Sequence, residues 1–349
     1  MNHRFVRTGL DVLHYSGISR LMAPFIAGVG AIFMLHHVRP GPDMPGGFAP
    51  NAGLDVTPDF LDAVIGFVKA RGWRLLSLQQ AVAELRSGEA AENPPFAVFT
   101  LDDGFRDNFT HAWPVFRRHE CPFTIFIAPH FCDGIGELWW EALERAIADN
   151  AEIRPMLGDF PDRLPTATEA QKQAAWEALY WPVRLMGQHG QRRWIRRFAA
   201  AHGVDLKALC RAQVMSWDEV REIAGDELCT IGAHTMRHFA LARLKDPEEA
   251  RHEMLASKTA LEHELKREIT TFAYPYGDET SAGYREFALA AEVGFEAAVT
   301  TRKGVIHPHH AEAPLALPRL SLNGFYQKIR YVDVLLSGLP FAISRRLAG

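Results

Sequence analysis

The pattern of apolar positions predicts short strands that alternate with amphipathic helices. Strands are expected at seven apolar runs, 31–38, 96–101, 122–128, 228–233, 270–274, 295–300 and 316–320. Many of the segments between them carry apolar residues at helical spacing, as at 58–72 and 247–265. Strand–helix–strand order with short links implies parallel strands and right-handed crossovers. The pattern therefore favours an α/β barrel or an open α/β sheet, in which functional residues gather at the carboxyl ends of the strands.

One segment breaks this alternation. Residues 132–215 are amphipathic, with helices expected at 138–147, 169–185 and 191–201. We interpret the segment as a helical cap inserted into one α/β domain of residues 31–324, between a helical lead-in (1–30) and an amphipathic helix (325–349). Four arginines of the cap are either a solvated helix face or a contact for phosphate or an anionic membrane, at positions 192, 193, 196 and 197.

Composition narrows the class of protein. The chain has 349 residues, of which 48% are hydrophobic and 23% charged, as in ordinary globular proteins. A net charge of −4 gives no overall basic field for nucleic acid. The four cysteines form no C-x-x-C pair, which predicts buried thiols in a reducing compartment. The apolar run at 21–35 contains proline and glycine and is short for a membrane span, so we expect no signal peptide and a cytoplasmic protein.

Two adjacent carboxylates follow the strand at 96–101. They are Asp102 and Asp103, and Gly104 comes next. Adjacent acids at the end of a buried strand are costly to desolvate unless something neutralises them, and a divalent metal would do so. Because successive strand residues point to opposite sides, both acids can serve one site only if the chain turns there, which Gly104 permits.

Two histidines offer further ligands. His234 and His238 follow the strand at 228–233, and one helical turn would put both imidazoles on one side. Alone, this spacing also fits two surface histidines at the start of a helix. Combined with acids at another strand end, it indicates a metal site of two histidines and one carboxylate. Such a site leaves open positions for the water that hydrolytic zinc activates.

Two more features lie at strand ends. The segment 272–277, with Pro275 and Tyr276, is either a simple β-turn or a rigid turn that aims a backbone N–H at an oxyanion. His36 and His37 end the first strand. Either they are part of the core or rim, or one of them donates a proton to a leaving amine.

Together, these motifs resemble those of the polysaccharide deacetylases, also called carbohydrate esterase family 4 or the nodulation-factor and chitin deacetylase homology domain. Residues 100–104 (TLDDG) resemble the family's T-F-D-D-G, 234–238 (HTMRH) match H-[ST]-x-x-H, and 272–277 (FAYPYG) resemble a third motif. The likeness covers residues 31–131 and 215–320. It implies a distorted (β/α)7-type barrel, here with an inserted helical cap, and a divalent metal that is usually zinc.

The resemblance also implies residue roles. The metal ligands would be one carboxylate and two imidazoles, from Asp103, His234 and His238. Asp102 would be the general base for the water that attacks an N-acetyl group of an amino sugar. The turn at Pro275 and Tyr276 would hold the oxyanion, and Thr235 would hydrogen-bond within the metal loop. Two histidines and one carboxylate also suit cobalt, nickel or manganese.

Two departures from the family pattern affect this assignment. Many members have an arginine in the third motif that orients the base, where this chain has Ala273; Arg319 is the candidate substitute. Many members also have a Leu-x-His acid near the C-terminus, which is absent here. The pattern occurs instead at residues 35–37, similar to the motif order of the poly-N-acetylglucosamine deacetylases. We therefore predict His37 as the acid, with His36 as the alternative.

The substrate and the surroundings remain open at this stage. The expected activity is metal-dependent deacetylation of an amino-sugar unit in a polysaccharide, oligosaccharide or lipid-linked glycan. The alternatives are an O-acetyl ester, a formamido sugar or a non-sugar amide as substrate, or a sugar-binding protein without activity. Trp139 and Trp140 are either core of the cap or a stacking wall for a sugar ring. The apolar lead-in and arginine-rich end suit a lipid-linked substrate and peripheral contact with the inner face of a membrane. No oligomeric state is indicated.

Overall fold

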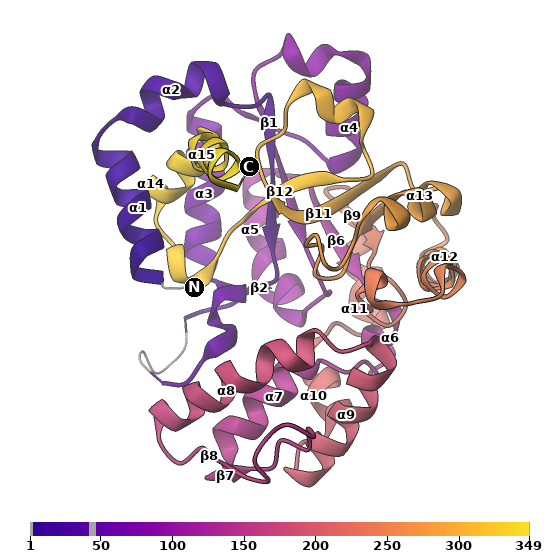
Figure 1. Cartoon of the computed structure of the whole chain (residues 1–349). Coiled ribbons are helices and arrows are strands. Elements are labelled where there is room, and N and C mark those ends of the chain that lie inside the picture. Colours follow the sequence, from indigo (N-terminus) through magenta and orange to yellow (C-terminus); the bar gives the residue numbers. More distant parts are fainter. Residues whose placement is uncertain (1–2, 42–46, 349) are drawn as a thin grey trace.

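The computed structural model describes residues 3–41 and 47–348 (Figure 1). At its centre is a closed barrel of seven parallel strands, and it confirms all seven predicted strands. In chain order they are β1 (Gly30–Leu35), β5 (Phe96–Leu101), β6 (Phe123–Ile127), β9 (Cys229–Ala233), β10 (Thr271–Ala273), β11 (Ala297–Lys303) and β12 (Leu317–Ser321). Around the barrel the order is β1-β12-β11-β10-β9-β6-β5. The barrel closes because β1 pairs with β12 on one side and with β5 on the other.

The first strand is shorter than its apolar run predicted. It ends at Leu35, and β2 (His37–Val38) pairs separately with β3 (Asp55–Val56). The reason is a contact from a residue distant in the sequence, since the backbone N–H of Val38 donates to Oδ1 of Asp107 at 2.9 Å. A further short strand, β4 (Arg74–Leu75), pairs with the start of β5.

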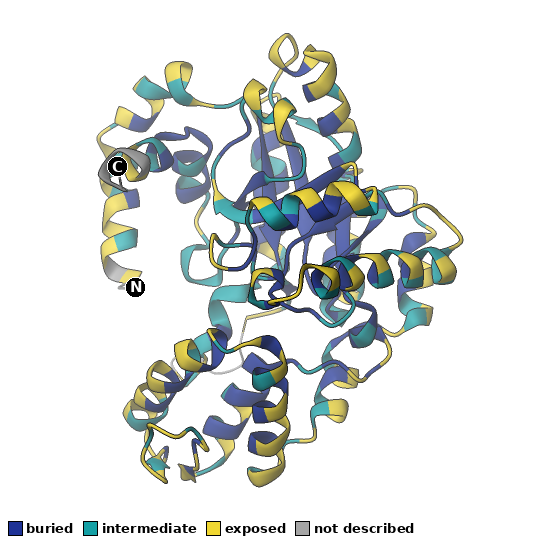
Figure 2. Cartoon of the chain, turned by 45° about the vertical axis from the view of Figure 1, so that its right-hand side comes forward, coloured by how far each residue is buried: buried dark blue, intermediate teal, exposed yellow. Residues whose placement is uncertain are grey.

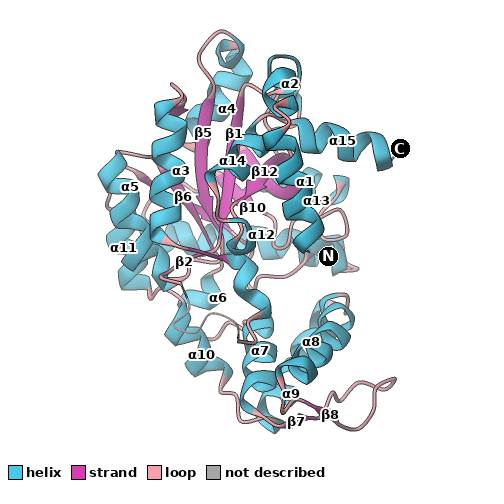
Figure 3. Ribbon diagram, turned by 90° about the vertical axis from the view of Figure 1, so that its left-hand side faces the viewer, coloured by secondary structure: helices cyan, strands magenta, loops and turns pink. Residues whose placement is uncertain are grey.

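The barrel interior is apolar and closed at its amino end. Phe96 and Val98 of β5 and Leu317 of β12 form one cluster with Leu78 and Leu85 of α4 (Leu78–Ser87). Figure 3 shows α4 beside the strands at the end opposite to the cap. Candidate functional side chains are therefore expected at the carboxyl end of the strands.

Helices surround the barrel and complete the predicted α/β alternation. They are α3 (Pro58–Ala70), α5 (Trp113–His119), α11 (Trp217–Ala224), α12 (Pro247–Leu265) and α13 (Tyr284–Val293). The predicted helix start at Thr57 is confirmed, because its hydroxyl accepts a hydrogen bond from the N–H of Phe60 at 3.2 Å. All four cysteines are buried and unbonded to one another, as predicted.

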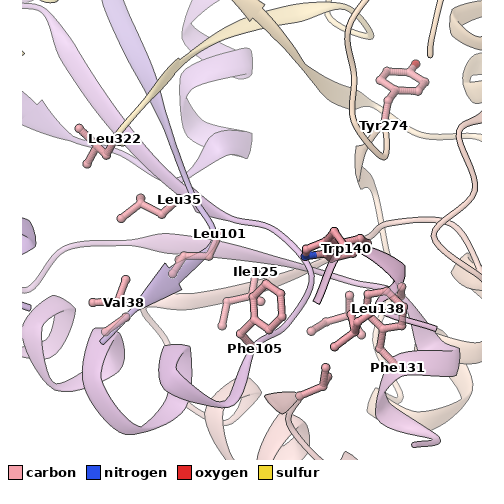
Figure 4. Close-up of a cluster of buried hydrophobic side chains, with 14 of the residues drawn as sticks. Leu35, Val38, Leu101, Phe105, Ile125, Phe131, Leu138, Trp140, Tyr274 and Leu322 are labelled. Atoms are coloured by element: carbon pink, nitrogen blue, oxygen red, sulfur yellow. The ribbon is translucent and has the colours of Figure 1, made fainter. Parts of the chain in front are cut away.

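The cap lies at the carboxyl end of the strands. After α6 (Pro129–Cys132) it contains α7 (Trp139–Asp149), α8 (Glu169–Arg184), α9 (Gln188–Ala201) and α10 (Leu206–Gln213), with a hairpin of β7 (Glu152–Ile153) and β8 (Leu164–Pro165). One apolar core joins the cap to the barrel, and Figure 4 shows Ile125 and Phe105 near Phe131, Leu138 and Trp140. This continuity fixes the cap above the strand ends.

Helices from both ends of the chain pack together outside the barrel. They are α1 (His3–Tyr15), α2 (Ile18–Ile26), α14 (Ile329–Leu336) and α15 (Leu339–Ala348). The prediction of a single helix at 325–349 is wrong, because Gly338, at φ 76°, separates two helices. Residues 1–2 and 349 of the two predicted end segments lie outside the described residues. Within the described ranges, no helix is long and apolar enough to cross a bilayer.

Candidate functional site

The chain turns sharply after β5, at the two acids. Asp103 has φ 74° and Gly104 has φ 71°, so the turn predicted at Gly104 includes the acid before it. Both carboxylates are only 2% exposed. A left-handed conformation is costly for a residue with a Cβ atom and persists only where the surroundings hold it. The turn lets two consecutive carboxylates face the same end of the barrel.

Asp102 is held by a buried arginine. Arg319, on β12, donates two hydrogen bonds to the two oxygens of Asp102, at 2.8 and 2.7 Å. It also donates to the hydroxyl of Thr100 at 3.0 Å and to the carbonyl of Thr300 at 2.8 Å. Burial alone would raise the pKa of Asp102, but the charge and hydrogen bonds of Arg319 outweigh it and lower the pKa. The carboxylate is therefore ionised and fixed in orientation.

Asp103, His234 and His238 meet at one point. Oδ1 of Asp103 lies 3.5 Å from Nε2 of His234 and 3.1 Å from Nε2 of His238. Two atoms bound ~2.0–2.1 Å from a tetrahedral ion lie ~3.4 Å apart, so these separations suit ligands of one ion. Among the described residues, these three form the one group of at least three potential ligands whose atoms lie within 4.8 Å of one another.

The donor set is prepared for a metal. The Nδ1–H of His234 donates to the carbonyl of Ala273 at 2.7 Å, which leaves Nε2 as the free nitrogen. Burial lowers the pKa of His238 to about 4, so its imidazole is neutral at pH 7. Oδ1 of Asp103 is buried and accepts no hydrogen bond of good geometry from the described residues. Such an oxygen is costly to bury without a cation, so the residues fit a divalent metal.

The loop at 234–238 is not the helical turn that its spacing predicted. Thr235 and His238 have φ 58° and 56°, and the loop is irregular. The Thr235 hydroxyl accepts a hydrogen bond from the N–H of Phe239 at 3.1 Å. Buried Arg192, on α9 of the cap, donates to the carbonyls of Arg237 and His238 at 2.9 and 3.2 Å. The two imidazoles meet because these contacts hold left-handed residues.

The two histidines after β1 have different surroundings. Nε2 of His36 lies 3.9 Å from Oδ2 of Asp102, and the His36 side chain is 19% exposed. His37 is buried, stacks on Phe105 and contacts Asp107 through Nδ1 at 2.5 Å. Burial lowers the pKa of His36, whereas Asp107 outweighs the effect of burial and raises the pKa of His37. The structure thus places the alternative, His36, beside the candidate base.

The Pro275–Tyr276 turn faces the same site. Tyr276 has φ 64°, its ring lies 4.9 Å from that of His238, and Pro275 is buried beside it. The N–H of Tyr276 has no acceptor among the described residues, so it is available to a ligand. Arg184, on α8, lies over the Tyr276 ring at 3.7 Å.

The two cap tryptophans are buried and contact residues of the site. They are 0% and 5% exposed, which favours core of the cap over a sugar-stacking wall, the two alternatives that the sequence left open. The indole N–H of Trp139 donates to the Tyr276 hydroxyl at 2.7 Å. The ring of Trp140 lies 5.2 Å from His238. Both rings are buried between the cap and the barrel, which leaves no free face for a sugar.

Sequence reasoning missed the partners of the site residues. Asp107 fixes His37 and β2, and its position four residues after Asp103 was the available signal. Arg192 gave only the general signal of a basic patch on the cap, and Arg184 gave no signal. The Ala273 carbonyl that orients His234 gave none, because a backbone atom leaves no mark on the sequence.

The sequence and the fold match known proteins. The family model of the polysaccharide deacetylases matches residues 89–298, which is more than half of the chain. No curated protein matches significantly. Solved structures share the fold at low identity.

The deacetylase PplD of Streptococcus pyogenes, solved with acetate, is 17% identical with a TM-score of 0.56, over 88% of this chain and 97% of that one. IcaB of Ammonifex degensii is 16% identical with a TM-score of 0.55, over 89% and 97%. The polysaccharide deacetylase BC0361 of Bacillus cereus is 14% identical with a TM-score of 0.54, over 88% and 68%.

Proposed function

Because this chain belongs to the polysaccharide deacetylase family, whose members hydrolyse carbon–nitrogen bonds other than peptide bonds, we propose that it removes N-acetyl groups from an amino-sugar unit. The proposal assigns the metal to Asp103, His234 and His238, the base to Asp102 and the acid to His36. The observation that carries it is the convergence of a buried, unbonded carboxylate oxygen with two Nε2 atoms beside a fixed second carboxylate.

The proposal gives the two adjacent acids different roles, with Asp103 as a metal ligand and Asp102 as the base. A divalent ion, when bound, lowers the pKa of a water and polarises the acetyl carbonyl. Asp102 takes a proton from the attacking water. Its pKa, lowered by Arg319, keeps it in the ionised form that a base needs, and the two-point contact with the guanidinium fixes its direction.

His36 is the better-placed acid. It is half-buried rather than enclosed, and its Nε2 lies 3.9 Å from Oδ2 of the base. His37 is fully enclosed, and its Nδ1 is committed to Asp107. The acid has to reach the nitrogen of the departing amino sugar, so partial exposure is a requirement. This assignment replaces the sequence-based preference for His37.

Tyr276 supplies the remaining group. Its N–H has no acceptor among the described residues, and the backbone at Tyr276 is left-handed. We assign this N–H to the oxyanion that forms when the acetyl carbonyl is attacked, for which one preorganised donor is worth about 3–4 kcal/mol. The buried Pro275 limits the freedom of the turn.

Acetate release tests the function. The purified full chain is incubated with N-acetylglucosamine oligomers, with and without a chelator, and then with added zinc, cobalt, nickel or manganese. We expect acetate release that the chelator abolishes and one or more metals restore. Tyr284→Asp serves as the variant control, because this side chain is 93% exposed on α13.

Two results would contradict the proposal. Full activity in excess chelator, or in Asp103→Ala, would exclude the metal mechanism. Inactivity toward oligomers together with turnover of an O-acetyl or N-formyl sugar would keep the site and replace the substrate.

A further inference from the structure

Exposed apolar side chains are concentrated on three helices outside the barrel. Among the described residues, thirteen large apolar side chains are exposed, and seven of them lie on α1, α2 and α15. We call these seven the outer apolar face: Phe5, Val12, Tyr15, Ile18, Leu21, Phe25 and Ile343. Four of them are more than 70% exposed. Exposed apolar side chains on helices that contact one another indicate an interaction site.

The outer apolar face is not needed to hold α1 in place. Val6, Leu10 and Leu13 already pack α1 against Tyr331 and Val334 of α14. Phe5, Val12 and Tyr15 recur at helical spacing on the opposite side. Figures 1 and 2 show α1 and α2 along one edge of the molecule, with long exposed stretches and away from the cap. The helix therefore has a second apolar side that nothing in the chain covers among the described residues.

Local charge indicates what covers this face. The sequences of α1, α2, α14 and α15 contain six arginines and two acidic residues, Asp11 and Asp333, although the whole chain has a net charge of −4. Asp11 is itself paired with Arg330 at 2.7 Å. A second copy of the same face would bring like charges together. An anionic lipid surface instead complements both the arginines and the aromatic and aliphatic side chains.

A groove lies between these helices and the barrel. It encloses about 830 Å3 between α1, α14 and α15 and the carboxyl ends of β11 and β12. Val6, Leu335 and Phe341 line its helical side. Arg319, which fixes the candidate base Asp102, lies in its barrel side together with Thr301. The groove is therefore apolar on its helical side, and Asp278, Arg302 and Lys303 line its barrel side at the carboxyl ends of the strands.

We propose that α1, α2 and α15 dock this protein on an anionic membrane surface, and that the groove takes the hydrocarbon chain of a lipid-linked amino-sugar substrate. The inference rests on the proposed deacetylation, because it names the carrier of the same sugar. Amphipathic helices bind such surfaces with their apolar side at the acyl boundary. Docking on this edge brings the groove to the bilayer and leaves the cap free on another side of the barrel.

Co-sedimentation tests the docking surface. The full chain is mixed with vesicles of phosphatidylglycerol and phosphatidylcholine, or of phosphatidylcholine alone. We expect binding to the anionic vesicles and at least tenfold weaker binding for Leu21→Asp/Phe25→Asp. Both positions are highly exposed, at 71% and 79%, so the double variant should fold. Tyr284→Asp, which removes a 93% exposed aromatic side chain elsewhere, should bind like the unchanged protein.

A chain that stays in the supernatant at low salt overturns the proposal, as does equal binding by the double variant. A dimer that Leu21→Asp/Phe25→Asp dissociates, in a chain that ignores vesicles, assigns the face to a second copy and also overturns it. Acetate release from a soluble N-acetylglucosamine oligomer should be the same in the unchanged protein and in Leu21→Asp/Phe25→Asp, since neither position lies in the site.

Substrate chain length tests the groove. Butyl, octyl and dodecyl N-acetylglucosaminides are compared as monomers below their micelle concentrations. We expect KM to fall as the chain lengthens, and to fall much less in Ser344→Trp, because Ser344 is exposed and lines the groove. Acetate release with one KM for all lengths would leave the deacetylase function intact and overturn the groove. Vesicle binding without release from any glycoside would remove the deacetylase function and leave the docking surface.

Discussion

Replacing Arg319 by methionine measures how far the site depends on one buried ion pair. Arg319 is 1% exposed and forms two parallel hydrogen bonds with Asp102. Methionine removes the charge and every donor. Removing one partner of a buried pair destabilises a protein by ~3–5 kcal/mol, because the other charge stays buried without compensation. We expect the free energy of unfolding of Arg319→Met to fall by about this amount, ~3–5 kcal/mol.

A double-mutant cycle separates the pair from other effects. Asp102→Asn/Arg319→Met leaves no uncompensated charge, so its loss should be smaller than the sum of the two single losses, by about 2 kcal/mol. Urea unfolding at pH 7, followed by circular dichroism, supplies the four free energies. Arg319→Lys should also lose activity, since an ammonium group cannot reproduce the two-point contact with the carboxylate.

Arg106→Met is the matched control. Arg106 contacts both oxygens of Glu219, at 3.0 and 3.2 Å, but its side chain is 35% exposed. An exposed pair of this kind contributes about 1 kcal/mol or less. If Arg319→Met is no more destabilising than Arg106→Met, or if the cycle is additive, the reasoning about the buried pair is refuted.

Three further predictions concern other residues. His36→Asn should lower kcat at least ~100-fold with little change in stability. His37→Asn should keep kcat within a few-fold and lower stability by ~1–3 kcal/mol, because Asp107 loses its partner. Acetate release and urea unfolding measure these effects, and the reverse pattern would restore His37 as the acid. Burial raises the pKa of Glu144 to about 7 from its ordinary 4.5, so the folded chain binds more protons than the unfolded chain between these pH values. Stability relative to Glu144→Gln should therefore fall as pH rises through this window, by at most ~3 kcal/mol, and urea unfolding at pH 5 and pH 8 would show no change if Glu144 has an ordinary pKa. Gly104→Ala should destabilise by ~1–3 kcal/mol in the same assay, because φ is 71° and a Cβ would lie 2.5 Å from Cδ1 of Ile127; an unchanged midpoint would show that the turn relaxes freely.

The apolar pattern was sufficient for the barrel and insufficient for its irregular ends. Runs such as Phe96–Leu101 are short, buried and bounded by turn residues, which leaves few alternatives to a strand. The end of β1 could not be predicted from its own residues, because Asp107, which holds Val38 by its N–H, lies 69 residues away. The same limit explains why the sequence alone favoured His37 over His36 as the acid.

The sequence identified the site residues, but it did not predict the backbone conformation that brings them together. Spacing identified His234 and His238, yet the helical turn expected there is an irregular loop with left-handed residues. Arg192 holds that loop from a cap helix 46 residues away along the chain. Trp140 shows the opposite limit: an aromatic residue beside a site suggested sugar stacking, and burial between two elements made it a support for the His238 ring.

Zinc bound per chain in Asp102→Asn and Asp103→Asn tests the central assignment most directly. The two substitutions are identical in chemistry and adjacent in sequence, and both side chains are 2% exposed in the unchanged protein. Elemental analysis after equilibration with limiting zinc should find about one ion per chain in Asp102→Asn, which should be inactive, and far less in Asp103→Asn. Equal zinc in both variants, or loss of zinc from Asp102→Asn alone, would contradict the division into a base and a ligand.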